Sequence, residues 1–176
     1  PFYRDLTPYL ALPVYYNLLH SKKCLIVAGR DSISTDLVDW MVQGLEDVTG
    51  VPDLWQTEIL VSAGYAGIDV GVLRYGDIHN RELLEQNAEF LEQVEFVILA
   101  EPSRMLATGQ VGLSLVFSLC ARGAPKTFAV FDGNHDGLVD SLSHLLKVSL
   151  SEVVAAAMPH GASSEMIWKP EGDHMS

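Results

Sequence analysis

The chain reads Leu25-Ile26-Val27-Ala28-Gly29-Arg30-Asp31-Ser32-Ile33-Ser34-Thr35 near its start. Its first four residues form a short, continuously apolar run, which is typical of a strand buried on both faces of a parallel sheet. From Leu37 to Leu45 apolar residues recur at helical spacing, and Ser34 or Thr35 is a candidate N-cap. The stretch therefore predicts a buried strand joined by a polar turn to an amphipathic helix.

The same alternation continues along the chain without repeats or low-complexity tracts. Helical patterns cover residues 10–20, 80–93, 111–121 and 138–146, and strand-like runs cover 68–73, 96–99, 128–131 and 153–156. Strands and helices in this order favour right-handed βαβ crossovers. We expect an α/β fold, a three-layer α/β/α domain with a mostly parallel central sheet and ligand loops at the carboxyl ends of its strands.

Composition sets the limits of size and partners. The 176 residues fit one domain, 1–176, and 48% hydrophobic residues are enough for a well-buried core. A formal charge of −12, with no basic cluster beyond Lys22-Lys23, disfavours nucleic-acid phosphates as partners. Because the chain begins at Pro1, we expect it to be a fragment of a longer protein.

Two features bear on the cellular compartment. Cys24 lies in an apolar strand and Cys120 in an apolar helix, so both are expected to be buried free thiols in a reducing, cytoplasmic setting. The longest apolar stretch, 111–121, is too short for a membrane span and is expected to be a core helix.

The turn after the first strand resembles a Walker A phosphate loop, Ala-Gly-Thr-Gly-Ser-Gly-Lys-Thr. The residues retained are Gly29, Ser32 and Thr35. Two glycine positions carry Asp31 and Ile33, and the lysine position carries Ser34. Backbone wrapping and the positive charge that hold phosphate are therefore lost, and Asp31 adds repulsion. The alternative is an ordinary capped turn between a strand and a helix.

The run Thr127-Phe128-Ala129-Val130-Phe131-Asp132-Gly133-Asn134-His135 resembles a helicase DExH box. Asp132 and His135 are retained, and Gly133 replaces the glutamate. The resemblance implies that the aspartate would hold Mg²⁺ through water, whereas the glutamate that positions the attacking water is missing. A vestigial site without hydrolysis is expected.

Three further runs resemble helicase motifs and occur in the same order along the chain. Glu101-Pro102-Ser103-Arg104 resembles the Thr-Pro-Gly-Arg motif that touches nucleic acid, with Arg104 retained, and Ala155-Ala156-Ala157 resembles a Ser-Ala-Thr motif without its hydroxyls. Leu6-Thr7-Pro8-Tyr9 is similar to a Leu-Arg-Pro-Tyr-Gln opening. Together these motifs resemble the first RecA-like lobe of a superfamily 2 helicase, a P-loop NTPase-like fold, in inactive form. The resemblance implies a pseudo-ATPase that serves as a structural or protein-interaction module, with a protein partner or a second lobe.

A calcium loop is a rival interpretation of the same segment. Asp132, Asn134 and Asp136 match the first metal-ligand positions of an EF-type loop, and Gly137 matches its turn position. Position twelve is Ser143 instead of the bidentate glutamate, and a strand precedes the loop where an EF-hand has a helix. A plain polar turn is the third interpretation.

Two other function classes stay open. One is an active nucleotide- or phosphosugar-using α/β enzyme with a divalent metal at Asp132, and the other is a non-hydrolysing nucleic-acid module that uses Arg104 within a longer chain. No cofactor is expected under the preferred hypothesis, whereas ATP with Mg²⁺, or Ca²⁺, belongs to the alternatives. The segment 167–173, with Trp168 beside charges, is expected to pack on a second lobe or a partner.

Overall fold

A computed structural model gives the architecture of the protein. It describes residues 2–62, 67–108, 110–121, 125–132, 152–157 and 165–170. The helices are α1 (Phe2–Leu19), α2 (Ser34–Thr49), α3 (Arg81–Gln86), α4 (Ala88–Leu91), α5 (Ser103–Thr108) and α6 (Gln110–Leu119), with short 3-10 turns at Asp31–Ile33 and Tyr75–Asp77. The strands are β1 (Lys23–Ala28), β2 (Thr57–Ile59), β3 (Val70–Leu73), β4 (Val94–Ala100), β5 (Lys126–Asp132), β6 (Glu152–Ala157) and β7 (Glu165–Pro170).

The strands form one sheet in the order β2-β3-β1-β4-β5-β6-β7. Pairing from β2 to β6 is parallel, and β7 runs antiparallel to β6. Parallel neighbours need crossover connections, which explains why the strands alternate with helices along the chain. The predicted mostly parallel sheet is confirmed.

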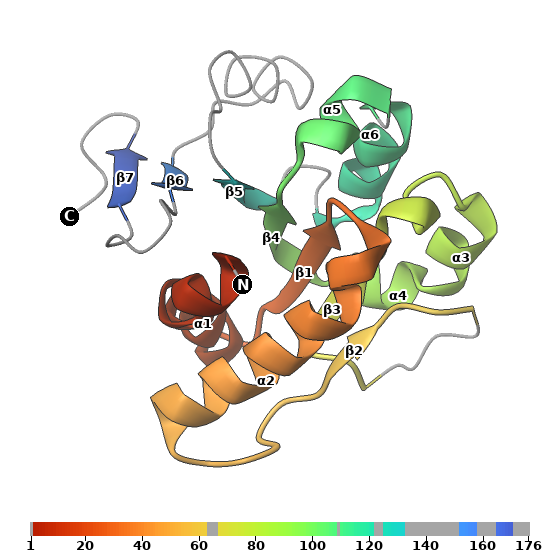
Figure 1. Cartoon of the computed structure of the whole chain (residues 1–176). Helices are drawn as coiled ribbons and strands as arrows, with labels where there is room; N and C mark the ends of the chain where they lie inside the picture. The colour runs from red at the N-terminus through yellow and green to blue at the C-terminus, as the bar shows by residue number, and fades with distance from the viewer. Residues whose placement is uncertain are drawn as a thin grey trace.

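Helices cover both faces of this sheet (Figure 1). The central strand β1 shows why, because its side chains alternate between two buried clusters. Leu25 and Val27 join the cluster formed with α3, α4 and α6, whereas Cys24 and Ile26 join the cluster formed with α1 and α2. A strand apolar at every position therefore needs a helical layer on each side, and the predicted three-layer α/β/α architecture is confirmed.

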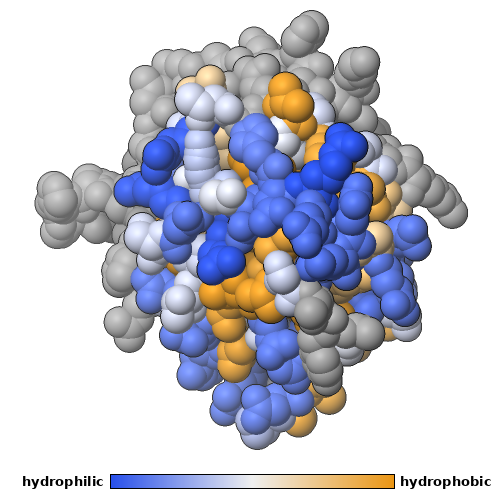
Figure 2. Space-filling model, turned by 90° about the vertical axis from the view of Figure 1, so that its right-hand side faces the viewer, coloured by the Kyte–Doolittle hydropathy of each residue, from blue (hydrophilic) through white to orange (hydrophobic). Residues whose placement is uncertain are grey.

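Figure 2 shows the side of the molecule that lies on the right in Figure 1. Hydrophilic side chains cover most of this side of the molecule, with a smaller apolar group near its middle. On α3, the acidic residues Glu82 and Glu85 are exposed. No described helix has both the length and the apolar composition that crossing a membrane requires.

Several boundaries differ from those that the sequence predicts. Helix α1 begins at Phe2 instead of residue 10, and α2 begins directly after a 3-10 turn, with Ile33 at its N-cap and no side-chain cap. The predicted cap at Ser34 or Thr35 is therefore wrong. The predicted helix over 138–146 lies outside the described residues.

The predicted helix over 80–93 is split at Asn87. The buried Asn87 amide donates to the carbonyl oxygens of Leu83, at 2.8 Å, and Val61, at 3.0 Å. A short amide side chain that bonds the backbone competes with helix continuation. Asn87 thus ends α3 and ties it to the segment that follows β2.

The strands β2 and β7 were not expected. β2 has three residues, too few to show a period, and β7 includes the Trp168 segment that we expected to pack on a partner. In the sheet, Trp168 lies opposite Val154 in register, so this segment completes an antiparallel edge of its own domain.

The strand order also fixes where loops gather. With the short β2 set aside, the order β3-β1-β4-β5-β6 is the doubly wound 2-1-3-4-5 arrangement. The chain reverses its direction of winding between β1 and β4, and the crevice outside the carboxyl ends of such a pair is the usual ligand position.

Gly71 in β3 has no space for a side chain. A Cβ there would lie 2.8 Å from Cε2 of Phe90 and 2.9 Å from Cδ2 of Leu60. We predict that Gly71→Ala lowers the free energy of unfolding by about 1–3 kcal/mol, because overpacking forces neighbours off their rotamers. Urea denaturation measures this, and the double variant with Phe90→Leu should recover part of the loss. Equal losses in the single and double variants would contradict the packing explanation.

Both cysteines are buried free thiols, as predicted. Burial raises the pKa of each thiol from 9.0 to about 12, and Asp69 adds to the effect at Cys24. Because each folded-state pKa lies above the unfolded value, the associated stability is present below pH 9 and declines as the pH rises toward 12.

We predict that neither thiol reacts with a disulfide reagent in the folded protein at neutral pH, because the reactive species is the thiolate. Both thiols should react once the protein is unfolded in urea. Thiol titration by absorbance measures the reaction, and rapid labelling of Cys24 or Cys120 under native conditions would contradict the burial described above.

Candidate functional site

Three loops meet at the carboxyl ends of the central strands. Gly29–Ile33 follows β1, Arg74–Asp77 follows β3, and Glu101–Arg104 follows β4. The first and third contain motif residues singled out in the sequence. Since β1 and β4 flank the switch point, this edge is where a ligand of the sheet would bind.

The base of this crevice is closed by backbone. The Gly29 N–H donates to the carbonyl oxygen of Ala100 at 2.8 Å. A Cβ at Gly29 would lie only 1.9 Å from the Glu101 carbonyl oxygen, so any other residue would collide with the neighbouring chain. Gly29 is therefore required for the close approach of β1 and β4.

Glu101 forms the other side of this contact. It has a left-handed φ of 55°, which is uncommon for a residue with a side chain, and it is only 8% exposed. Its Oε1 accepts a hydrogen bond from Ser103 Oγ at 2.5 Å. Glu101, the first residue of the run that resembles a Thr-Pro-Gly-Arg motif, is thus a buried carboxylate held by its own loop.

Asp31 connects the first loop to the second. Its Oδ1 accepts a hydrogen bond from the Gly76 N–H at 2.9 Å, which joins the loop after β1 to the loop after β3. A backbone N–H of this kind is the donor that a phosphate-binding loop offers to its ligand. Here a carboxylate of the chain itself takes that bond.

The third loop contacts the second through Arg104. Its guanidinium carbon lies 4.8 Å from the ring centroid of Tyr75, within range of a cation–π contact. The Tyr75 hydroxyl is hydrogen-bonded to Thr108 Oγ1 at 2.5 Å, and Arg74 Nε donates to Asp77 Oδ2 at 2.9 Å. The loops are thus joined by contacts with one another.

The vestigial phosphate loop does not gather into one site. Gly29 is buried beneath Glu101, Ser32 is exposed, and Thr35 lines a separate groove beside β2. Ser34, at the lysine position, is 1% exposed, and its hydroxyl has no hydrogen-bond partner in the described part of the chain.

The vestigial DExH residues are only partly described. Asp132 ends β5, which is separated from β1 by β4. His135, Asn134 and Asp136 lie outside the described residues, so neither the DExH resemblance nor the calcium loop is tested. Within the described ranges, no three His, Cys, Asp or Glu side chains gather where a metal could bind.

The chain matches no protein-family model and no curated protein. The interpretation of the site therefore rests on its own geometry. The loop after β1 contacts the chain after β4 through the Gly29 N–H bond to the Ala100 carbonyl and the close approach to the Glu101 carbonyl, and it is bonded to the loop after β3 through Asp31.

Sequence reasoning missed two of the connecting residues. Tyr75 follows a buried strand within a Tyr-Gly-Asp turn, which marks a loop at the ligand edge but no contact partner. The Asp31 to Gly76 bond joins residues on different loops, so no local spacing predicts it. The Asp31 bond depends on the adjacency of β1 and β3, whereas the Tyr75 contacts join the loop after β3 to residues that follow β4.

We predict that Gly29→Ala severely destabilises the protein, by about 3 kcal/mol or more, because the new methyl meets fixed backbone. Gly50→Ala is the matched control, since Gly50 has φ 71° and nothing lies within 4 Å of the position that its Cβ would take. That change should cost only about 1 kcal/mol of backbone strain. Circular dichroism during urea denaturation gives both values, and equal losses would contradict the account of the closed crevice.

Proposed function

We propose that the chain is a non-catalytic, helicase-like ATPase lobe that acts as a structural or protein-interaction module. The observation that carries this proposal is the closed contact of Gly29 with the Glu101 carbonyl, together with the Asp31 bond to Gly76. A triphosphate at this edge would need open backbone donors and a nearby cation. In these loops the Glu101 carboxylate is buried, and the Gly76 N–H is engaged by Asp31. The exposed cations are Arg30 and Arg104, and the Arg104 guanidinium lies over Tyr75.

Ser34 supports the absence of phosphate chemistry. A lysine that neutralises phosphate must extend from its helix toward the ligand, whereas the position occupied by Ser34 is 1% exposed and faces the core. A single substitution to lysine is therefore insufficient to restore the function of the loop.

The strand order limits how far the resemblance extends. Ala155-Ala156-Ala157 lies on β6, and both β4 and β5 separate that strand from β1. In active relatives the corresponding motif is expected to couple the nucleotide site to nucleic-acid binding. Such coupling would have to cross two strands here, which favours a scaffold over a motor.

Nucleic-acid binding is a weaker candidate. Arg104 is exposed, but its guanidinium lies over Tyr75, and the chain has a formal charge of −12. Electrostatics therefore oppose a phosphate backbone unless other parts of a longer chain contribute. A protein partner or a second lobe in a reducing, cytoplasmic setting fits this charge and the two buried thiols.

The test is a phosphate-release assay with ATP and Mg²⁺. We predict no turnover above the buffer rate for the chain, and no change on Asp132→Ala. Hydrolysis that disappears in Asp132→Ala would overturn the proposal in favour of an active enzyme with a metal at Asp132.

The same assay includes Ser34→Lys as an attempted repair. We predict no gained turnover and a loss of at least about 2 kcal/mol in unfolding free energy, because an ammonium group enters a buried position. Thr35→Lys is the matched control at an exposed neighbouring position and should stay within about 0.5 kcal/mol. Nucleotide hydrolysis restored by Ser34→Lys would show that the loop is intact.

A further inference from the structure

Among the described strands, the sheet ends at β2. This strand stands at the end of the strand order and pairs in parallel with β3. Two backbone hydrogen bonds flank β2 on the side of β3. The Val70 N–H donates to the Gln56 carbonyl oxygen, and the Leu60 N–H donates to the Val72 carbonyl oxygen. Because bonding alternates along a strand, the backbone groups of Thr57 and Ile59 point away from β3. They are positioned to pair with an added strand.

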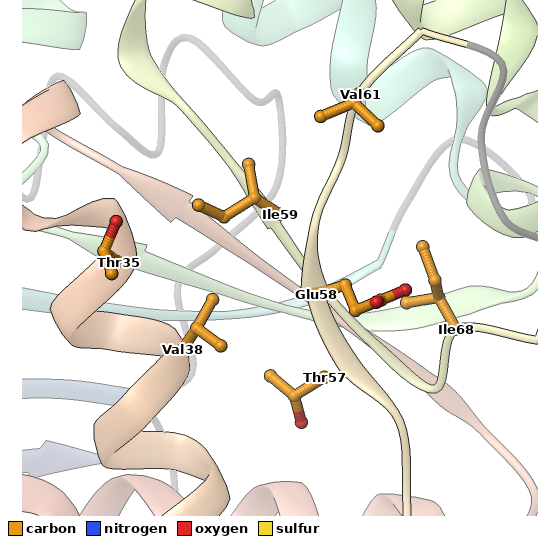
Figure 3. A pocket seen from close by; sticks show the side chains of 7 residues that line it. All are labelled: Thr35, Val38, Thr57, Glu58, Ile59, Val61 and Ile68. Atoms are coloured by element: carbon orange, nitrogen blue, oxygen red, sulfur yellow. The ribbon is translucent and has the colours of Figure 1, made fainter.

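A groove lies between this edge and helix α2. Its volume is about 360 Å³, and its lining residues are Thr35, Val38, Thr57, Glu58, Ile59, Val61 and Ile68. Figure 3 shows Thr35 and Val38 on the helix, with Thr57, Glu58 and Ile59 along the neighbouring strand. The groove therefore offers apolar contacts directly beside the side of β2 that pairs with no described strand.

Two groove residues are unusual for a solvent-facing surface. Val61 is 48% exposed although it is a large apolar residue. Thr57 is 7% exposed, and its buried hydroxyl has no hydrogen-bond partner among the described residues. A buried hydroxyl without a partner is destabilising, so a polar group brought by a bound segment would be stabilising.

The charge of this region indicates the partner. Between residues 31 and 73 the chain has eight acidic residues and no Lys, Arg or His. Helix α2 and the segment through β2 contribute six of them: Asp36, Asp39, Glu46, Asp47, Asp53 and Glu58. Asp69 is excluded from this set because it is paired with Lys23. These six acids favour a positively charged partner.

Glu58 also argues against a second copy of this chain. A charged residue on an edge strand opposes pairing with an identical edge, because the two carboxylates would come close together. The same carboxylate attracts a basic segment. The edge is thus selective for charge as well as for extended conformation.

We propose that the β2 edge and the α2 groove bind an extended, basic peptide segment of a partner protein, which adds a strand to the sheet. Strand addition gives affinity through main-chain hydrogen bonds, and alternate side chains give specificity. Apolar side chains of the segment would enter the groove, and basic ones would face Glu58. This inference rests on the proposed interaction role, but it names a surface separate from the closed crevice.

The experiment selects peptides from a phage-displayed library of random linear sequences on the immobilised chain. We expect enrichment of basic residues alternating with apolar or β-branched ones. The enriched peptide is then synthesised, and its affinity for the chain and its variants is measured by fluorescence anisotropy. Absence of enrichment, or an acidic consensus, would overturn the proposal.

Three variants locate the site. Thr35→Arg and Glu58→Lys place positive charge at the groove, and each should weaken binding by about threefold or more. Ile59→Pro removes an outward N–H and should weaken binding about 3–10-fold, the loss of one hydrogen bond. Ile59→Pro also alters a packed side chain and could prevent folding. In that case Thr35→Arg, at an exposed helix position, decides whether the peptide binds at the groove.

Glu82→Lys is the matched control. It makes the same charge change on α3, in the opposite helical layer, and should alter affinity less than twofold. Equal weakening by Glu82→Lys and Glu58→Lys would show that net charge alone governs binding and would overturn the proposed site. A stable dimer that Ile59→Pro disrupts would assign the edge to a second copy instead.

The outcome is separable from that of the proposed function. Lack of peptide binding together with no ATP turnover would reject this docking surface and leave the non-catalytic role intact. ATP turnover that depends on Asp132 would reject the non-catalytic role whether or not peptides bind.

Discussion

The close approach of Gly29 to the Glu101 carbonyl is the contact on which the carboxyl edge of the sheet depends. It brings the chain after β1 against the chain after β4 at the point where the sheet changes its direction of winding. Only glycine fits there, and the Gly29 bond to Ala100 continues the strand pairing beyond β1. The place where related architectures open a crevice is therefore occupied by backbone.

The loops around this contact bond to one another instead of presenting donors to a ligand. Asp31 accepts from Gly76, Glu101 accepts from Ser103, and Arg104 lies over Tyr75. Each of the two hydrogen bonds engages a donor, the Gly76 N–H or the Ser103 hydroxyl, that a phosphate site would leave available. Among the described residues, two buried hydroxyls have no hydrogen-bond partner, that of Ser34 beside the first loop and that of Thr57 on β2. The β2 strand is paired on one side, with β3.

The sequence predicted the elements that have a strong local signal. The runs that became β1 and β4 are apolar at successive positions, because helices cover both faces of the sheet. β2 was missed because three residues show no period, and the break at Asn87 was missed because its cause is a bond to Val61, distant in sequence. Local pattern also cannot fix strand order, which depends on contacts between segments far apart along the chain.

Prediction of the site was limited for the same reason. The sequence places Gly29 and Glu101 just after two strand-like runs, because βα alternation puts loops at one edge of the sheet, but it does not predict that these two strands are neighbours. It could not predict the left-handed backbone of Glu101 or its burial, since both depend on the approach of Gly29. Thr35, grouped with Gly29 by its motif, instead lines the groove beside β2.

Calorimetric titration of the chain with ATP and Mg²⁺ tests the central claim most directly, because it detects binding whether or not hydrolysis follows. The closed contact of Gly29 with Glu101 predicts no heat beyond dilution. Stoichiometric binding would contradict it, since a triphosphate could enter only if the two loops separate.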